Sequence, residues 1–289
     1  MKPDFSQTLP KQYQPAGLYV VATPIGNLQD ITLRALELLQ TADLIACEDT
    51  RVSGKLLSAY GIKSKLLSYN DHNAGERRHQ IFDAIRDDQK VVLISDAGTP
   101  LVSDPGYKLV RDAIAEGFYV TALPGASSVI TGLCLSGLPS DRFFFAGFLP
   151  SKTEARKKDI ASLAAVPSTL IFFESAKRLV ACLEALHEGL GDREAAVMRE
   201  LTKLHEEAER GTLQKLIAHY SKQGEPKGEI VIVVAPPLAQ EVSDEEIRAQ
   251  MLALLSDHSV KEAAAILSEQ TGRPRKELYT LALSLQDKS

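Results

Sequence analysis

Short runs of β-branched and apolar residues alternate with segments of helical periodicity between Gly17 and about Gly137 of this 289-residue chain. The apolar runs read LYVVAT, DLIACE, KLLSY, KVVLIS and FYVTAL, and the helical segments between them include ITLRALELLQ and YKLVRDAIAEG. Strands that alternate with helices form a largely parallel sheet with helices on its faces. The alternation therefore predicts an α/β fold for this half of the chain.

A second α/β series follows the aromatic segment PSDRFFFAGFLP, residues 139–150. It predicts strands near STLIFFE, AAVMREL and EIVIVVA, with helices between them. We expect two α/β lobes, residues 17–138 and 139–237, with a boundary near Leu138 to Ser140. A single doubly wound domain of this length is the alternative.

Residues 243–285 are polar and helical. Ser243 with Glu246, and Ser259 with Glu262, fit capping boxes that each open a helix. A glycine turn separates the last two helices, so the segment resembles a helix-turn-helix unit. A helical cap or a dimerisation element is the alternative reading.

Residues 1–16 contain prolines and no apolar core, which predicts a flexible tail and neither a signal peptide nor a membrane helix. No later apolar run approaches membrane-spanning length, so we expect a cytoplasmic protein. Cys47, Cys134 and Cys182 are far apart in apolar segments and are expected to be buried free thiols.

Three loops rich in glycine, proline and small hydroxyl residues follow predicted strands. They are residues 95–106 (SDAGTPLVSDPG), 23–28 (TPIGNL) and 124–128 (PGASS). In open α/β sheets, ligands bind at the loops that follow the carboxyl ends of the strands. We expect Asp96 to face a ribose diol or a cation, and Asp104 to cap the next helix. Ordinary strand-to-helix turns, with serines as helix caps, would explain the same residues.

Glu48, Asp49 and Arg51 follow one predicted strand, and His72 follows another. Over a ligand cleft, such acids orient a hydroxyl, an arginine clamps a phosphate, and a histidine acts as a base. We take these four as candidate catalytic residues. Surface salt bridges, caps and turns are the ordinary alternative.

Charge and motif spacing exclude several functions. A net charge of -5 argues against a protein held on nucleic acid by its overall field, so a local basic patch is required. The sequence has no G-x-G-x-x-G after a strand and no G-x-x-x-x-G-K-[ST], which excludes a Rossmann dinucleotide site and a P-loop. The six histidines show no metal-ligand spacing, so we predict no metal.

Two basic clusters are candidate contacts for RNA. One opens the second lobe beside aromatic residues, and the other begins the last predicted helix. Their members are Lys152, Arg156, Lys157, Arg273, Arg275 and Lys276. Solvated helix faces explain such charges equally well.

Several motifs occur together in one order: TPIGNLQDIT, EDTR, SDAGTPLVSDPG, PGASS, GLPSDRFFFAGFLP, TLIFFES, RELTK with HEE, and KGEIVIVV. In this order they resemble the ribosomal RNA small subunit methyltransferase I family, a branch of the tetrapyrrole-methylase-like, class III S-adenosylmethionine-dependent methyltransferases. The resemblance covers about residues 17–235, and the tail after Ser243 resembles the helix-turn-helix extension of that branch. It implies a homodimer in which the cofactor cleft lies between two α/β lobes.

The resemblance also implies which residues border S-adenosylmethionine. Those in the first lobe are Pro24, Asp96, Thr99, Val102, Ser127 and Ser128. Phe172 and the strand that begins after Gly228 would close the second-lobe side.

The implied reaction is 2′-O-methylation of a cytidine ribose in the decoding region of 16S rRNA, either in free RNA or in the small ribosomal subunit. Glu48, Asp49 and His72 are the candidate bases, and Arg51 would hold a neighbouring phosphate. One alternative is a class III methyltransferase that acts on a tetrapyrrole or another small molecule, or on a protein side chain. Another is a non-catalytic RNA-binding regulator that senses the cofactor.

Overall fold

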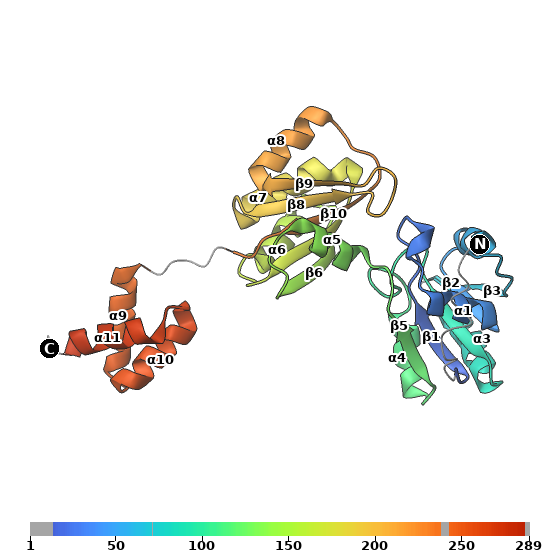
Figure 1. Ribbon diagram of the computed structural model, residues 1–289, viewed down its shortest axis with the longest axis horizontal. Helices are drawn as coiled ribbons and strands as arrows, with labels where there is room; N and C mark the ends of the chain where they lie inside the picture. The colour runs from blue at the N-terminus through green and yellow to red at the C-terminus, as the bar shows by residue number, and fades with distance from the viewer. Residues whose placement is uncertain (1–13, 71, 238–242, 287–289) are drawn as a thin grey trace, which may run out of the picture. The chain divides into compact units, whose positions relative to one another are not determined.

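The computed structural model describes residues 14–70, 72–237 and 243–286, and Figure 1 shows its helices and strands. Most of the expected N-terminal tail, residues 1–13, lies outside the described residues. The chain divides into two compact units, residues 1–237 and 238–289. The first unit contains two sheets, and the second contains helices.

The first lobe is built on a five-stranded parallel sheet with the order β3-β2-β4-β1-β5. Its strands are β1 (Gly17–Val21), β2 (Leu44–Cys47), β3 (Leu66–Ser68), β4 (Lys90–Ile94) and β5 (Val120–Leu123). The helices that connect them are α1 (Leu33–Thr41), α2 (Thr50–Ala59), α3 (Ala74–Arg86) and α4 (Tyr107–Ala115). This is the predicted parallel α/β arrangement.

The central strands β1, β2 and β4 are buried on both faces, which explains why nearly all of their residues are apolar. Neighbouring residues of a strand point to opposite faces. Tyr19 accordingly packs in a core with residues of α1 and α2, whereas Leu18 packs with residues of α3 and α4. Parallel strands end at the same edge, so the loops after β1, β4 and β5 meet there.

The second lobe is built on a five-stranded mixed sheet with the order β6-β7-β10-β8-β9. Its strands are β6 (Phe143–Phe148), β7 (Thr169–Ser175), β8 (Glu194–Arg199), β9 (Glu207–Thr212) and β10 (Glu229–Val234). Only β6 and β7 pair in parallel, and the other neighbours are antiparallel. One face packs against the helices α6 (Thr153–Leu163), α7 (Leu179–Leu190) and α8 (Leu213–Gln223).

Helix α5 (Ser128–Ser136) covers the other face of this second sheet, as Figure 1 shows. Its Val129 and Leu133 pack with Met198 and Val231 of the sheet. The boundary expected near residue 138 would place this helix in the first lobe, whereas its packing joins it to the second. The reason is that the apolar side chains of α5 find their buried surface on β8 and β10.

The second unit contains three helices among its described residues: α9 (Asp244–Leu255), α10 (Val260–Thr271) and α11 (Arg275–Gln286). Both predicted capping boxes are present, at Ser243 with Glu246 and at Ser259 with Glu262. The helices share a small core of their own, which includes Met251, Leu267 and Leu278. Among the described residues, no helix is both long and apolar enough to cross a membrane.

Candidate functional site

A cavity of about 420 Å³ lies between the loop edge of the first sheet and the second sheet, within the first compact unit. This volume falls in the range of roughly 300–1,000 Å³ that small-molecule sites occupy. We call it the interlobe cavity. It is lined by Ile25, Ala97, Gly98, Thr99, Val102, Ser103, Asp104, Ser127, Ser128, Val129, Phe148, Phe173, Glu174, Ser175, Ala176, Leu201, Gly228, Glu229, Ile230 and Val231.

Hydrogen bonds tie the three loops of the first lobe into one rim. Thr23 and Gly98 exchange two backbone hydrogen bonds of 2.9 and 3.0 Å, which join the loops after β1 and β4. The Thr99 hydroxyl donates to the Ala126 carbonyl at 3.0 Å, which joins the loop after β4 to the loop after β5. The sequence therefore predicted correctly that these loops would meet, because parallel strands deliver them to one edge.

The loop of residues 95–106 bends into the cavity through two residues in the left-handed region. Leu101 has a φ of +74° and Ser103 a φ of +63°, conformations that cost non-glycine residues free energy and that cluster at functional sites. Val102 and Asp104 line the cavity.

The expectation that Asp104 caps the next helix is wrong. Gly106 is the N-cap of α4, and no side chain caps that end. Asp104 instead turns toward the interlobe cavity. Partial burial raises the pKa of its carboxyl, and the nearby charge of Asp96 adds to the rise, whereas a hydrogen bond with Ser95 opposes it.

Ser127 and Ser128 line the cavity at the start of α5. Ser127 is the N-cap residue, yet its hydroxyl makes no capping hydrogen bond. The first backbone N–H groups of a helix lack intrahelical partners and carry partial positive charge. This end of α5 therefore offers hydroxyl and N–H groups to a polar ligand.

Phe172 does not line the cavity, contrary to what the resemblance implies. It is fully buried on the opposite face of β7, in the core with α6, α7 and α8. The next residue, Phe173, faces the cavity and packs edge to face against Phe148, with ring centroids 5.5 Å apart. A shift of one residue along a strand exchanges the two faces of the sheet.

Gly228 lines the interlobe cavity on its second-lobe side, beside the first residue of β10. The loop that faces it, between β8 and β9, contains two more residues with positive φ, Glu200 at +52° and Thr202 at +64°. The carboxylate of Glu200 accepts a hydrogen bond from the backbone N–H of Glu229 at 3.0 Å. Thr202 reaches across to the first lobe, where its hydroxyl accepts the Asn27 backbone N–H at 3.1 Å.

The charges that line the cavity are all of one sign. Asp104, Glu174 and Glu229 contribute carboxylates, and none of the described lining residues is a lysine, arginine or histidine. Such a cavity disfavours phosphate groups and favours a ligand with positive charge.

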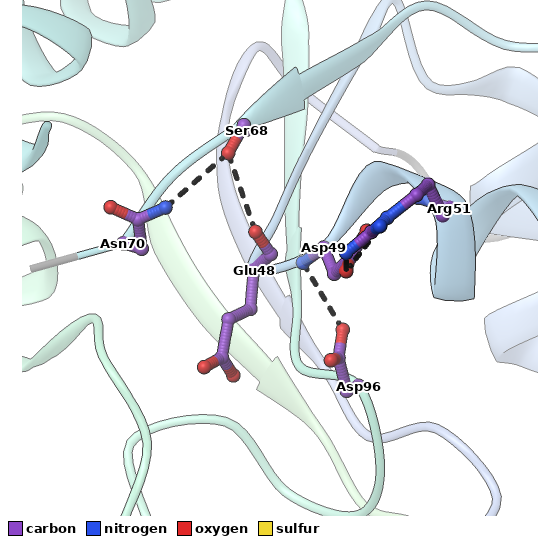
Figure 2. A network of polar contacts seen from close by, with 6 residues as sticks. All are labelled: Glu48, Asp49, Arg51, Ser68, Asn70 and Asp96. Carbon is purple, nitrogen blue, oxygen red and sulfur yellow. Dashed lines mark hydrogen bonds and ion pairs between the residues drawn. The ribbon is translucent and has the colours of Figure 1, made fainter.

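Asp96 and Pro24 lie next to the cavity and do not line it. Pro24 is buried between the lining residue Ile25 and the rim residue Thr23. The carboxylate of Asp96 accepts the backbone N–H of Asp49 at 3.2 Å, as Figure 2 shows. Burial raises the pKa of Asp96, and this hydrogen bond opposes the rise.

Asp49 and Arg51 form a tight pair at the start of α2. Asp49 is the N-cap residue, and its carboxylate accepts the Arg51 backbone N–H at 2.8 Å and its guanidinium at 2.6 Å. Hydrogen bonds from Arg51 lower the pKa of Asp49 to about 2. The Arg51 side chain is 85% exposed and therefore accessible to an external phosphate.

Glu48 and His72 stand apart from this pair. Figure 2 shows the Glu48 side chain pointing away from Arg51, while the Glu48 carbonyl accepts the Ser68 hydroxyl at 3.3 Å. His72 is exposed in the turn before α3, and its backbone N–H donates to the Asn70 side chain at 3.1 Å. None of the four catalytic candidates lines the interlobe cavity.

In the basic cluster at α6, some side chains are partly buried or ion-paired within the protein and others are exposed. Lys152 is exposed just before the helix, and Arg156 is half-buried. Lys157 forms a 2.8 Å ion pair with Glu188. Of these residues, Lys152 is the most available for an external anion.

Of the basic residues at the start of α11, one is held by ion pairs and the others are more available to an external anion. Arg273 lies 2.6 Å from Asp244 and 3.4 Å from Glu277, so it holds the helical unit together. Arg275 donates to the Lys261 carbonyl at 3.3 Å, and Lys276 is exposed.

One group of potential metal ligands exists among the described residues, formed by Glu207, Glu209 and His219. Arg199 already binds Glu207 at 2.6 Å and supplies positive charge there. The absence of a metal therefore stays a prediction. Among the cysteines, Cys47 and Cys182 are buried as expected, but Cys134 is exposed, because it lies on the outer side of α5.

Sequence reasoning missed several residues that line the cavity, notably Glu174, Leu201 and Phe148. Glu174 carried a signal, because it is an acid at the end of the apolar strand TLIFFE. Leu201 lies at the end of the predicted strand AAVMREL, but its local pattern did not indicate that the left-handed turn after β8 would carry it to the cavity.

Comparison with family models gives two matches that together cover most of the chain. Residues 17–217 match the model of tetrapyrrole (corrin/porphyrin) methylases. Residues 241–286 match the model of the RsmI C-terminal HTH domain.

Two curated relatives are similar to this chain over nearly their whole length. The chain is 51% identical to "Ribosomal RNA small subunit methyltransferase I" of Mesorhizobium japonicum, over 94% of this chain and 93% of that protein. It is 43% identical to the protein of the same name in Escherichia coli O157:H7, over 96% of this chain and 99% of that protein.

Solved structures share the fold at low identity. A cobalt precorrin-4 methyltransferase superposes with a TM-score of 0.58 at 20% identity, over 75% of this chain and 94% of that one. A uroporphyrin-III C-methyltransferase from Thermus thermophilus, complexed with S-adenyl homocysteine, superposes with a TM-score of 0.53 at 20% identity, over 75% of this chain and 96% of that one. These likenesses show the two-lobed architecture.

Proposed function

This chain belongs to the ribosomal RNA small subunit methyltransferase I family, an S-adenosylmethionine-dependent branch of the tetrapyrrole methylases, and we propose that it methylates the ribose 2′-hydroxyl of a cytidine in 16S rRNA. The relatives' names support methylation of the small-subunit rRNA. The 2′-oxygen and the cytidine are the finer part of the proposal, which rests on the sequence motifs.

The observation that carries the proposal is the charge and shape of the interlobe cavity. It is large enough for a small ligand, offers hydroxyl and helix N-terminal N–H groups, and is lined by carboxylates with no basic residue among its described lining. Nucleotide cofactors with phosphates require positive charge. S-adenosylmethionine carries an adenosine, a positive sulfonium and no phosphate, so it fits this set of groups. When bound, it supplies an electrophilic methyl group.

Within that cavity the first-lobe residues Thr99, Val102, Ser127 and Ser128 are proposed to contact the cofactor, with Gly228 on the opposite side. Phe173 replaces Phe172 as the aromatic contact. Pro24 and Asp96 are proposed to shape the rim from behind. Holding two reactants in line supplies roughly 7–11 kcal/mol of such a barrier, so positioning is the main task of these residues.

The ribose hydroxyl must lose its proton when its oxygen attacks the methyl carbon. A positioned general base contributes roughly 10²–10⁴-fold. Asp49 is poorly suited to this role, because its pKa of about 2 makes it a weak proton acceptor. Glu48 and His72 remain the proposed candidates, and the exposed Arg51 is proposed to hold a phosphate of the RNA.

The RNA is proposed to be held by the second compact unit as well, through Arg275 and Lys276, and by Lys152 beside α6. Arg156 and Lys157 are weaker candidates, since one is half-buried and the other is paired. A homodimer is also proposed. Strand β6 is the edge of its sheet and exposes Phe143 and Phe144, a surface typical of protein contacts.

The test is incubation of the purified protein with methyl-labelled S-adenosylmethionine and either small ribosomal subunits or free 16S rRNA. We expect label in the RNA at one cytidine, found as a block to alkaline cleavage, because a 2′-O-methyl group removes the nucleophile of that reaction. Label on the base, or no label under conditions where the cofactor binds, would contradict the proposal. Label on a ribosomal protein, or label on a tetrapyrrole in a parallel incubation that supplies one, would instead support the alternative substrates.

A further inference from the structure

The carboxylates of the interlobe cavity differ in whether the protein itself neutralises them. Glu174 has Arg178 at 3.2 Å, and Glu229 has Lys203 at 3.2 Å. Asp104 has no such partner, because no basic side chain of the described residues lies within 4.0 Å of its carboxylate. Asp104 is therefore the lining residue whose charge is left uncompensated.

The loop presses this charge into the cavity at a cost. Leu101 and Ser103 on its approach both adopt positive φ, and Gly106 ends the bend before α4 begins. Asp104 is half-buried, and the carboxylate of Asp96 nearby repels it. A hydrogen bond with Ser95 offsets part of this cost, but no cationic side chain does, so a ligand cation in the cavity would stabilise the carboxylate.

We propose that Asp104 is the counter-ion for the sulfonium of the methyl donor, and that it makes the interlobe cavity prefer the cationic donor to its uncharged thioether product. This inference rests on the proposed use of S-adenosylmethionine. Donor and product share the adenosine, the ammonium and the carboxylate. They differ in one methyl group and in the positive charge on sulfur, and a carboxylate beside the sulfur responds to the charge.

As a consequence, the protein binds the donor more tightly than the product and releases the product after methyl transfer. Transfer of the methyl group leaves a neutral sulfur, and the attraction to Asp104 disappears at the same moment. The product then leaves more readily than the donor. Glu174 and Glu229 act less strongly in this way. Glu174 is paired with Arg178, and the largely exposed Glu229 is screened by solvent and shares Lys203 with Glu200.

The test is calorimetric binding of three ligands: S-adenosylmethionine, sinefungin, in which a carbon bearing a protonated amine replaces the methylated sulfur, and S-adenosylhomocysteine. Wild-type protein, Asp104→Asn and Asp104→Glu are compared. We expect Asp104→Asn to weaken both cationic ligands by about tenfold to a hundredfold, the effect of losing one charge-assisted contact, while the neutral product binds nearly as before. Asp104→Glu should keep the preference for the cationic ligands. Asp87→Asn removes an exposed carboxylate from the same lobe and controls for net charge.

Equal weakening of all three ligands by Asp104→Asn would overturn the inference, because Asp104 would then contact the shared ammonium or ribose. No weakening of any ligand would also overturn it. Intact binding of the product reports that the variant is folded. If wild-type protein bound none of the three ligands, the proposed function itself would fail, which is a distinct result.

Discussion

The side chain of Glu200 occupies the space that a Cβ atom on residue 228 would fill. Gly228 also has a φ of +106°, so this position is closed to other residues by both space and backbone conformation. Glu200 in turn receives the Glu229 backbone N–H and an ion pair from Lys203 at 2.8 Å. The glycine thereby fixes the loop that completes the interlobe cavity.

Gly228→Ala should therefore displace Glu200 and disturb the second-lobe wall of the cavity. We expect a loss of about 1–3 kcal/mol in the free energy of unfolding, the cost of one strained residue, together with weaker binding of S-adenosylmethionine. Urea unfolding and calorimetry measure the two effects.

Gly224→Ala is the matched control for this glycine. Gly224 has a φ of +80°, and no atom lies within 4 Å of the position of a Cβ. Gly224→Ala should lower the free energy of unfolding by about 1–2 kcal/mol through backbone strain alone, and it should bind the cofactor as the wild type does. Weaker cofactor binding in this variant too would show that the effect of Gly228→Ala is not local.

The first lobe could be predicted well from the sequence because its strands and loops follow from interactions between residues close together in the chain. Strands such as KVVLI, residues 90–94, are apolar on both faces, and parallel strands bring the following loops to one edge. The meeting of Thr23 with Gly98 follows from that rule. The capping boxes at Ser243 and Ser259 were predicted for the same reason, since each involves residues only three apart.

What escaped prediction depends on tertiary contacts. The run TLIFFES is apolar at consecutive positions, so alternation could not decide whether Phe172 or Phe173 faces the cavity. Strand β9 reads EAERGT, a charged segment that is a strand because it pairs with β8 at the sheet edge. Asp104 has the spacing of a helix cap, and only the bend through Ser103 turns it to the cavity.

A comparison of Ser127 with Thr32 can separate an effect on cofactor binding from an effect on helix capping. The Ser127 hydroxyl lines the cavity and makes no capping hydrogen bond, whereas the Thr32 hydroxyl accepts the Ala35 N–H at 3.1 Å and caps α1. Ser127→Ala should weaken cofactor binding with little change in stability. Thr32→Ala should lose about 1 kcal/mol of stability and leave cofactor affinity unchanged. Thermal unfolding and calorimetry on both variants decide the matter, and the reverse pattern would show that Ser127 is a structural residue.

Asp49 gives a prediction about pH. Its pKa is lowered from 3.8 to about 2, chiefly by the hydrogen bond from Arg51. Its stabilising contribution is therefore complete above 3.8 and is lost as the pH falls through about 2. Around neutral pH Asp49 stays ionised, so Asp49→Asn should leave the shape of the pH–rate profile of methyl transfer unchanged. An acidic limb that is present in the wild type and disappears in this variant would identify Asp49 as the base.

The pair with Arg51 is tested separately by carboxyl NMR. In Arg51→Gln the Asp49 carboxyl loses its main hydrogen-bond donor, and its titration should move from about 2 back toward 3.8. Lys55→Gln, on the same helix α2, removes a positive charge that makes no ion pair with Asp49 and should leave the titration in place. An unmoved titration in Arg51→Gln would mean that the helix N-terminus lowers the pKa instead.

The helical unit can be tested for RNA contact because its basic residues divide by role. Arg273 is held by Asp244 and Glu277, so Arg273→Ala should destabilise the unit. Arg275 and Lys276 lie within 4.0 Å of no carboxylate among the described residues, and changing both to alanine should weaken binding to 16S rRNA while the unit stays folded. Each lost phosphate contact should reduce the slope of log affinity against log salt by about 0.7–0.9.

Binding is followed by filter retention over a series of salt concentrations, and Lys261→Ala on the neighbouring helix α10 is the control for net charge. If the slope is the same in the double variant as in the wild type, α11 does not contact phosphates, and its basic residues serve only the fold or a protein contact.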